Sequence, residues 1–554
     1  MPYKAKTRTV FGNAKNAVEV SDHRGRFIKN GRVGCHDTVM HEIELKFQVP
    51  AGQRDALAKA VAGRTPARRV RLQAAYCDTA QRALAQARMA LRVRREGRQW
   101  VQTLKAATAD GMTRLEHNVP LGAGAGMDVG APQADPARHA GTPAGDRLRT
   151  ALDSARGSAP GEPLAVLFQT DILRRTRVQR TSLGRVELAL DSGSITAGAS
   201  KLAVHELEIE LLSGSPQAVI LAARRWVARF GLWLDTRSKA ERGDMLARGV
   251  SMAAPRTASA LRLAPGMSAA QALRAVLASC ADQVLVNASQ VASGEHVDEH
   301  VHQLRIGLRR LRSGLRLFEG TPVDAGLELA AATLFGRLGA ARDQVVIEGE
   351  FAAELQAALQ GAGVSGDVPR VTLPDDDEVP AAVLRDAASQ TLLLDLLAAM
   401  HAEDSTLDVA DANDDKAGTP MDDEPLRDRL AARLNRWHRR AAADAKRYRE
   451  LDDAGRHRLR KRVKRLRYAL EFSAALFKPR ELRRYLKALG AVQERLGAIN
   501  DVVVAMEAFN RHRDTDPRAW FALGWLAARR ELLIAKALPD LKAFARAKRL
   551  GKAG

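Results

Sequence analysis

The sequence predicts a multidomain α+β protein, with strands in the N-terminal part and helices in the C-terminal part. Two observations predict this division. Polar and apolar residues alternate in several short runs between Glu42 and Leu211, which is typical of β-strands. A helix-periodic segment then occurs twice, at 302–312 and 457–467. A chain of 554 residues has room for roughly two to four domains.

The first strand is predicted over residues 42–47. Alternation places Glu42, Glu44 and Lys46 on one face and apolar residues on the other. Two carboxylates about 7 Å apart on one strand repel each other unless a cation lies between them. A solvated outer face would explain one such strand as well as a functional site would.

Further strand-like runs each carry one sign of charge. Acidic positions occur at Glu187, Asp191, Glu206, Glu208 and Glu210, and basic positions at Arg92, Arg94, Lys105 and Arg174. If these strands close into a barrel, one interior wall is acidic and the other basic. Carboxylates bind hard divalent cations, whereas Lys and Arg bind phosphate oxygens. Sorting of the charges strand by strand therefore favours a metal-polyphosphate site over a solvated face.

These runs contain motifs that resemble the CYTH family, the triphosphate tunnel metalloenzymes. The motifs are Glu42-x-Glu-x-Lys46, Tyr76-Cys-Asp-Thr79, Ala90-Leu-Arg-Val-Arg94, Gln102-Thr-Leu-Lys105, Phe168-x-Thr-x-x-x-Arg174, Glu187-x-x-x-Asp191-x-Gly193 and Ser238-Lys-Ala-Glu-Arg-Gly243. The resemblance spans residues 41–246. It implies an eight-stranded antiparallel β tunnel that binds triphosphate together with Mg²⁺ or Mn²⁺.

The resemblance also implies roles for individual residues. Glu42, Glu44 and Lys46 would be catalytic, and the metal ligands would be Glu42, Glu44, Asp191, Glu206, Glu208 and Glu210. Phosphate would be bound by Lys46, Arg92, Arg94, Lys105, Arg174 and Lys239. The segment 205–214 is most similar to the inorganic triphosphatase branch, which implies hydrolysis of inorganic triphosphate to pyrophosphate and phosphate. The alternatives are a non-catalytic polyphosphate-binding protein and an enzyme for an organic triphosphate, of the thiamine triphosphatase or adenylate cyclase type.

The repeated helical segment places cations along one helix face in each copy. The first copy carries His302, Arg305, Arg309 and Arg312, and the second carries His457, Arg460, Lys464 and Arg467 at matching positions. Leucines and a valine form the opposite, apolar face. The repeat predicts two related helical bundles about a pseudo-twofold axis. One basic face alone could be solubilising surface, but two matching faces favour a groove that binds a chain of phosphates.

The helical part resembles the CHAD family over residues 267–550. The residues that carry the resemblance are Glu299-His-Val-His-Gln-Leu-Arg305, Arg460-Lys-Arg-Val-Lys-Arg-Leu-Arg-Tyr468 and Gln493-Glu-x-Leu-Gly-x-Ile-Asn-Asp501. The resemblance implies an all-α domain of two four-helix bundles that binds polyphosphate. For His302 and His457, phosphate contact, a structural hydrogen bond and metal binding stay open, with phosphate favoured because cations surround both. Asp343 and Asp501 could orient arginines or cap helices.

Composition narrows the class of partner. The net charge of +22 indicates a polyanionic partner, and an aromatic content of 4% argues against stacking on single-stranded nucleic acid. Cys35, Cys77 and Cys280 have no paired or metal-binding spacing, which fits a reducing cytoplasm, with association with polyphosphate granules as an extension. No apolar run reaches the ~20 residues of a membrane span.

The remaining segments are predicted to lack chemistry. Residues 1–39 are basic and aperiodic, so we expect a disordered extension or a misassigned start, with Met40 as the natural first residue. Residues 247–266 are expected to form a linker. Acidic loops are expected at 374–378 and 408–424, and a loose Gly/Ala/Pro-rich insertion at 122–163.

Overall fold

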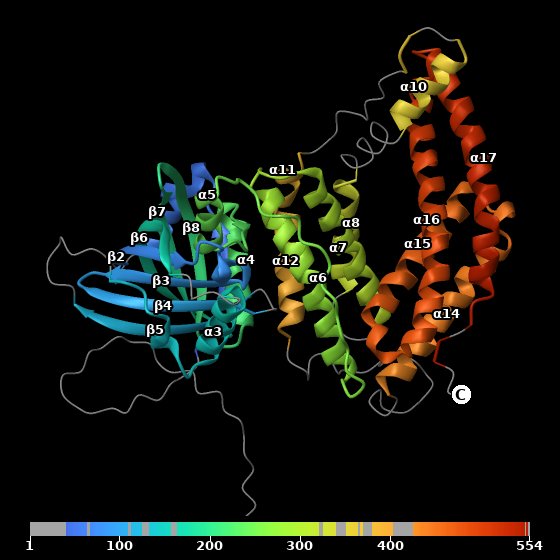
Figure 1. Cartoon of the computed structure of the whole chain (residues 1–554). Helices are drawn as coiled ribbons and strands as arrows, with labels where there is room; N and C mark the ends of the chain where they lie inside the picture. Colours follow the sequence, from blue (N-terminus) through green and yellow to red (C-terminus); the bar gives the residue numbers. More distant parts are fainter. Residues whose placement is uncertain are drawn as a thin grey trace, which may run out of the picture.

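The computed structural model describes residues 40–63, 67–108, 112–123, 132–156, 163–320, 325–339, 351–363, 366–368, 379–402, 425–548 and 550–551. A β-barrel lies beside a larger helical region (Figure 1). The predictions for residues 1–39, Asp343, 374–378 and 408–424 lie outside the described residues, as does Cys35 within the first of these ranges.

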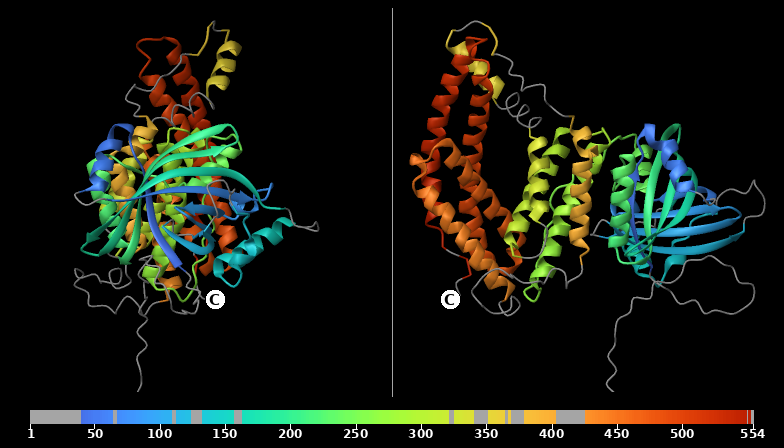
Figure 2. Two further views of the ribbon diagram at one scale, coloured as in Figure 1. Left: turned by 90° about the vertical axis from the view of Figure 1, so that its left-hand side faces the viewer. Right: turned by 180° about the vertical axis from the view of Figure 1, so that it is seen from behind.

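Eight antiparallel strands form the barrel (Figure 2). They are β1 (Met40–Gln48), β2 (Arg68–Asp78), β3 (Met89–Glu96), β4 (Gln99–Ala107), β5 (Thr113–Ala123), β6 (Ala165–Thr181), β7 (Gly184–Ala197) and β8 (Ser200–Gly214). The order is β5-β4-β3-β2-β6-β7-β8-β1, and β1 also pairs with β5, which closes the sheet. A short strand β9 (Trp233–Leu234) pairs with the end of β1. The predicted eight-stranded antiparallel tunnel is confirmed.

Alternation on β1 and its neighbours separates a charged inner face from an apolar outer face, whereas β2 turns apolar residues such as Leu72 and Tyr76 into the cavity. On β1, Glu44 and Lys46 line the central cavity, whereas Leu45 and Phe47 belong to the hydrophobic core. Helix α4 (Gln217–Phe230) packs against β1, β7 and β8 and covers this apolar face. Helix α1 (Arg54–Ala62) packs on β6 and β7. Burial of the outer face thus fixes the register that turns the charged residues inward.

The insertion expected to be loose contains regular structure. Its described part forms the 3-10 helix η2 (Pro136–His139) and helix α3 (Pro143–Arg156). Leu148 of α3 is buried with Leu91 of β3 and Leu104 of β4. The expectation of a loose insertion is therefore wrong over residues 136–156, because the outer face of β3 and β4 needs an apolar cover that composition alone did not reveal.

Two helical groups follow the barrel. The first contains α6 (Ala269–Ala292), α7 (Asp298–Leu317), α8 (Ala325–Arg337), α11 (Pro380–Arg385) and α12 (Ala387–Met400). The second contains α14 (Leu426–Lys446), α15 (Asp453–Phe472), α16 (Pro479–Asn510) and α17 (Arg518–Ala545), with α10 (Ala352–Gly361) packed on α17. Helices α7 and α15, which carry the sequence repeat, contact each other where the two groups meet.

The barrel and the helical region share one hydrophobic core. Helix α4 packs on α12, where the Gln217 side chain donates a hydrogen bond to the Ala398 carbonyl at 2.9 Å. The segment expected to be a linker is also fixed, because the Asn287 side chain of α6 binds both the backbone N–H and the carbonyl of Arg256, at 3.0 and 2.9 Å. Every helix in the described part of the chain is too short or too polar to cross a lipid bilayer.

Candidate functional site

A cavity of about 1030 Å³ runs through the barrel interior. The adjoining strands β7, β8, β1 and β5 supply the central group of carboxylates, and β6, β3 and β4 supply cations that include Arg174, Arg92, Arg94 and Lys105. Lys46, Arg114 and Arg185 add cations on the acidic strands themselves. All of the tunnel residues predicted from the sequence line this cavity except Glu206. The two-walled charge distribution expected from the alternation is thus present in the folded barrel.

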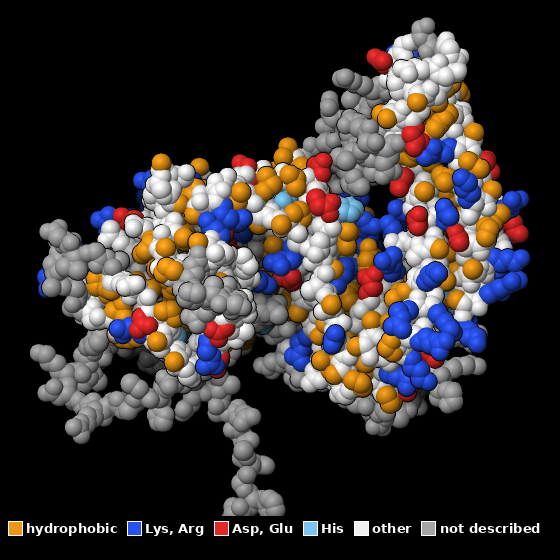
Figure 3. All heavy atoms as spheres, viewed as in Figure 1, with side chains coloured by type: hydrophobic (Ala, Val, Ile, Leu, Met, Phe, Trp, Pro, Cys, Tyr) orange, Lys and Arg blue, Asp and Glu red, His pale blue; other side chains and the backbone are white. Residues whose placement is uncertain are grey.

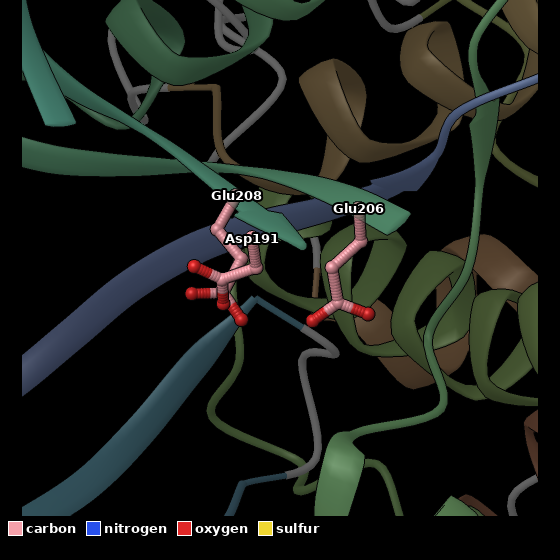
Figure 4. A group of neighbouring side chains, drawn as sticks. All are labelled: Asp191, Glu206 and Glu208. Carbon is pink, nitrogen blue, oxygen red and sulfur yellow. The ribbon is translucent and has the colours of Figure 1, made fainter. Parts of the chain in front are cut away.

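Three of the predicted metal ligands lie together. Carboxylate oxygens of Asp191, Glu206 and Glu208 all lie within 4.8 Å of one another, and their side chains extend from the neighbouring strands β7 and β8 (Figure 4). The Lys239 ammonium lies among them, at 2.6 Å from Asp191 Oδ2 and 2.8 Å from Glu208 Oε1, and it also binds Glu206. Sequence reasoning assigned Lys239 to phosphate. Here its ammonium instead occupies the position that a cation would take in this carboxylate cluster.

Two arginines complete the neutralisation of this cluster. Arg174 donates two hydrogen bonds of 2.7 Å to Asp191 and also pairs with Glu208, while Arg242 pairs with Glu206. Glu206 is fully buried behind Lys239. Its position is that of an internal counterion, and its predicted role as a metal ligand stays a prediction.

Helix α5 (Lys239–Ala247) holds Lys239 and Arg242 in place. Ser238 caps the helix, and Glu241 returns a side-chain contact to the cap in a capping box. Gly243 lies against the ring of Phe168, where an added Cβ would come within 2.2 Å of ring carbon Cε2. The motif from Ser238 to Gly243 thus combines a helix cap with two cations, Lys239 and Arg242, and ends with a glycine that allows close packing on Phe168.

A second group of carboxylates is only partly neutralised by neighbouring cations, with Glu42 paired to Lys105 at 2.5 Å. Glu44, Glu210 and Glu187 lie side by side in register across β1, β8 and β7. Burial raises the pKa of Glu210 to about 7, and Glu44 and Glu187 add to the rise although Lys105 opposes it. Burial also raises the pKa of Glu42 well above its usual range, despite Lys105. We call Glu42, Glu44, Glu187 and Glu210 the carboxylate belt. The neighbouring cations neutralise only part of the negative charge of this belt.

Glu44 differs from its neighbours because cations surround it. Burial alone would raise the pKa of Glu44, but Lys46 and Arg114 lower it to about 2. The Lys46 ammonium lies 3.0 Å from Glu44 Oε1, and both side chains are almost fully buried. Glu44 is thus ionised, next to carboxylates that hold their protons more tightly.

Strand β5 supplies tunnel residues that the sequence reasoning missed. Glu116 pairs with Lys105 at 2.9 Å, and Arg114 lies 3.4 Å from Glu44. Alternation in the run Thr113 to Asn118, with Leu115 facing outward, would have identified both residues. Glu187 was present in a quoted motif but received no role.

The basic wall contains two arginines with unused hydrogen-bond donors, although Arg94 pairs with Glu96. The buried Nε atoms of Arg92 and Arg94 have no hydrogen-bond partner among the described residues. Burial and the neighbouring Arg92 lower the pKa of Arg94. Arg92 donates a hydrogen bond of 3.1 Å to the hydroxyl of Tyr76, whose ring stacks on Phe168. This wall has donors and positive charge available for an anion.

A second basic site lies where α7 meets α15. Burial, together with Arg309 of α7 and Arg460 of α15, lowers the pKa of Lys464 to about 6, and Asp501 opposes this shift. Arg305 donates hydrogen bonds to the carbonyls of Leu338 and Gly339, at 3.0 and 2.9 Å. The repeat therefore brings cations of both copies into one cluster, as the sequence predicts.

Other predicted residues of this helical site have local partners. Arg312 lies 3.4 Å from Glu328, and Arg467 pairs with Glu471 at 2.9 Å. His457 Nδ1 lies 3.2 Å from Asn500 Oδ1, whereas His302 is half-buried on the first turns of α7. Lysine and arginine side chains also gather on the visible face of the second helical group (Figure 3).

Comparison with known proteins agrees with this architecture. Residues 40–243 match the CYTH domain family and residues 275–510 match the CHAD domain family. An inorganic triphosphatase of Haemophilus influenzae is 28% identical over 174 residues, which cover 31% of this chain and 44% of the relative. The chain thus spans less than half the length of this curated relative.

Two solved structures are similar to single domains. The CHAD domain from the plant Ricinus communis is 30% identical, with a TM-score of 0.43, and covers 54% of this chain and 100% of its own. A Hippeastrum adenylyl cyclase with dominant triphosphatase activity is 17% identical, with a TM-score of 0.27, and covers 38% of this chain and 97% of its own. The chain belongs to the proteins in which a CYTH domain is followed by a CHAD domain.

Proposed function

We propose that the barrel hydrolyses inorganic triphosphate to pyrophosphate and phosphate with a divalent cation, Mg²⁺ or Mn²⁺. One observation carries the proposal: carboxylates of β1, β8 and β7, among which Glu42 and Glu210 have raised pKa values, face arginines of β3 with unused N–H donors across one cavity. Binding of a polyanion alone would not require the acidic wall. A metal-triphosphate complex needs both walls.

The carboxylate belt fits a hard cation. Oxygen ligands with excess negative charge are the preferred donors for Mg²⁺ and Mn²⁺. We assign Glu42, Glu44 and Glu210 as the principal ligands, with Glu208 at the edge of the belt and Asp191 and Glu206 behind Lys239. A bound divalent cation would supply charge neutralisation and activation of water.

The basic wall would hold the triphosphate in position. Arg92 and Arg94 would bind phosphate oxygens with their free N–H groups, and Lys105 and Arg174 would extend the contact toward the carboxylates. Four of these cations already pair with carboxylates, so their phosphate contacts would be shared with those ion pairs: Lys46, Lys105, Arg174 and Lys239. Catalysis in this site is orientation and charge stabilisation by fixed groups.

A substrate panel tests the reaction against its two rivals. We expect phosphate release from tripolyphosphate to exceed release from thiamine triphosphate and ATP by at least about tenfold in kcat/KM. Preference for an organic triphosphate, or cyclic nucleotide formation, would contradict the assignment of substrate. Tight binding of tripolyphosphate without turnover would show that the barrel binds polyphosphate without catalysing its hydrolysis.

We further propose that the helical domain binds polyphosphate through the α7–α15 cluster. The supporting observation is a partly buried lysine, Lys464, that lies near Arg309 and Arg460, with Asp501 opposing their charge. A bound chain of phosphates would supply the missing negative charge. Binding of this kind would also hold the protein near polyphosphate stores in the cytoplasm.

The pKa of Lys464 gives this binding a predictable pH dependence. Because the pKa is about 6 in the unliganded fold and an anion favours the charged form, binding takes up a proton above pH 6. We expect polyphosphate affinity to fall as pH rises from 6 to 9, by roughly tenfold per pH unit at most.

Lys464→Arg is the matched variant for this prediction. Arginine keeps its charge over the whole range, so affinity should become nearly independent of pH, whereas Lys464→Met should bind weakly throughout. Isothermal titration of full-length protein with polyphosphate at fixed salt measures all three. A wild-type affinity that stays constant with pH would contradict the role of Lys464.

A further inference from the structure

The tunnel cavity is lined by more than the barrel. Beyond the ends of β2 and β4 its wall continues onto the helical domain through Asp282 and Gln290 of α6 and His300 of α7. The volume of about 1030 Å³ lies at the upper end of the range for small-molecule sites. One mouth of the tunnel is therefore built jointly by both domains.

Two arginines face one carboxylate at this mouth. Arg88 Nη1 of the barrel lies 3.7 Å from Asp282 Oδ1, and Arg256 Nε of the interdomain segment lies 3.7 Å from Asp282 Oδ2. Both distances allow attraction but exceed hydrogen-bond length. The mouth consequently carries excess positive charge, with guanidinium N–H groups that Asp282 does not engage.

The backbone at Arg88 points to a role for its side chain. Arg88 has a φ of +57° and Arg82 a φ of +62°, and these are the only non-glycine residues with positive φ in the described part of the chain. This conformation is unfavourable for residues with a Cβ, and glycine would adopt it without strain. Strained positions of this kind cluster at binding sites.

Arg82 and Arg88 differ in what their side chains do. Arg82 pairs with Asp244 on α5, which gives it a structural partner. Arg88 is 41% exposed, and within the described part of the chain the charged partner of its side chain is Asp282, at 3.7 Å. Partly exposed pairs of this kind contribute little to stability. Stability therefore explains Arg82 but leaves the arginine at position 88 unexplained.

The segment that carries Arg256 is held rigidly. Gln290 of α6 accepts a hydrogen bond from the Ala253 N–H at 3.3 Å, and His300 Nε2 lies 2.9 Å from the Ala253 carbonyl. Asn287 fixes both backbone groups of Arg256. The helical domain thus places Arg256 at the mouth, as it places Asp282.

We propose that Arg88 and Arg256, held together by Asp282, form a phosphate-binding site at the mouth for linear polyphosphates longer than tripolyphosphate. The end of such a chain occupies the tunnel, and its outer phosphates bind the two guanidinium groups. The inference rests on the proposed function of the barrel. It assigns the helical domain a direct part in substrate selection, separate from the α7–α15 cluster.

Kinetics with two substrates test this site. In full-length Arg88→Ala/Arg256→Ala, we expect kcat/KM for long-chain polyphosphate, relative to tripolyphosphate, to fall about tenfold or more. Arg69→Ala/Arg71→Ala removes two cations from the exposed outer face of β2 and should leave the ratio unchanged. An unchanged ratio in the mouth variant, or an equal fall in both variants, would overturn the proposal.

Arg88→Gly separates binding from folding. Glycine accommodates the positive φ, so the thermal midpoint should equal or exceed that of the wild type, while the substrate ratio falls as in the alanine variant. A lower midpoint with an unchanged ratio would make Arg88 a structural tie between the domains, and the proposal would fail.

A binding measurement keeps the proposal testable if the wild type hydrolyses neither substrate. In an Arg460→Ala/Lys464→Ala background, which weakens the helical cluster, adding Arg88→Ala/Arg256→Ala should weaken long-chain polyphosphate binding by about tenfold. Equal affinity with and without the mouth arginines would overturn the mouth site. Absent turnover with the expected loss of affinity would overturn only the triphosphatase reaction.

Discussion

Replacement of Lys239 by methionine is expected to destabilise the barrel by about 3–5 kcal/mol, because it leaves buried carboxylates without their central cation. Asp191 and Glu206 are fully buried, and the Lys239 ammonium contacts both as well as Glu208. Turnover of tripolyphosphate should also fall by about a hundredfold or more, since the cluster forms the end of the metal-binding belt. Thermal unfolding and phosphate release measure the two effects.

The same variant tests whether these carboxylates can bind metal. If Asp191, Glu206 and Glu208 are ligands, Mg²⁺ or Mn²⁺ should raise the unfolding midpoint of Lys239→Met more than that of the wild type. Lys201→Met, an exposed lysine on the same strand as Glu208, is the matched control and should behave as the wild type. A Lys239→Met protein of unchanged stability would contradict the ion-pair network described here.

Replacement of Arg94 by methionine should lower activity without lowering stability, whereas Lys239→Met is expected to lower both. Burial and Arg92 disfavour the charged form of Arg94, as the lowered pKa indicates, and its Nε has no hydrogen-bond partner among the described residues. Its ion pair with the partly exposed Glu96 offsets only part of this cost. The variant should therefore be as stable as the wild type or more so, by up to about 1 kcal/mol. Its kcat/KM for tripolyphosphate should fall by about a hundredfold, because a fixed phosphate contact is lost.

Arg71→Met provides the control for this second prediction. Arg71 lies on the outer face of β2, with a side chain that is 66% exposed and that pairs with the exposed Asp171. Its removal should change neither stability nor kinetics appreciably. Loss of stability in Arg94→Met with activity retained would place Arg94 among structural residues and remove it from the phosphate wall.

The barrel was predictable because its signal is local. Strict alternation around Glu44 and Glu208 decides which side chains face inward as soon as one face must be buried. Closure of β1 onto β5 is a long-range pairing that no local pattern contains. The number of strands accordingly came from family resemblance, and the structure confirmed it.

The sequence predicted which charged residues line the tunnel, but only partly which of them form ion pairs with one another. The sequence places Lys239 near phosphate-binding residues, yet its position among Asp191 and Glu206 depends on how α5 packs against β7 and β8. Such a tertiary contact cannot be read from spacing. Arg114 and Glu116, by contrast, follow the same alternation as the predicted strands and were available to the same reasoning.

The junction between domains was the least predictable part. Residues 247–266 have the composition of a linker, but Arg256 and its neighbours are fixed by polar side chains of α6. Those side chains lie on α6, whose sequence is typical of a helix buried in a hydrophobic core. The placement of Arg256 at the tunnel mouth depends on side-chain to backbone hydrogen bonds, which leave no periodic pattern in the sequence.

Phosphate release from tripolyphosphate, with and without Mg²⁺, by the wild type and by Glu42→Gln/Glu44→Gln tests the central claim most directly. We predict turnover that requires the divalent cation and falls by about a thousandfold or more in the double variant, whose side chains keep their shape but lose the charge that holds the cation. Wild-type turnover that is independent of metal, or a double variant with unimpaired metal-dependent turnover, would contradict the assignment of the barrel carboxylates as a metal-dependent triphosphatase site.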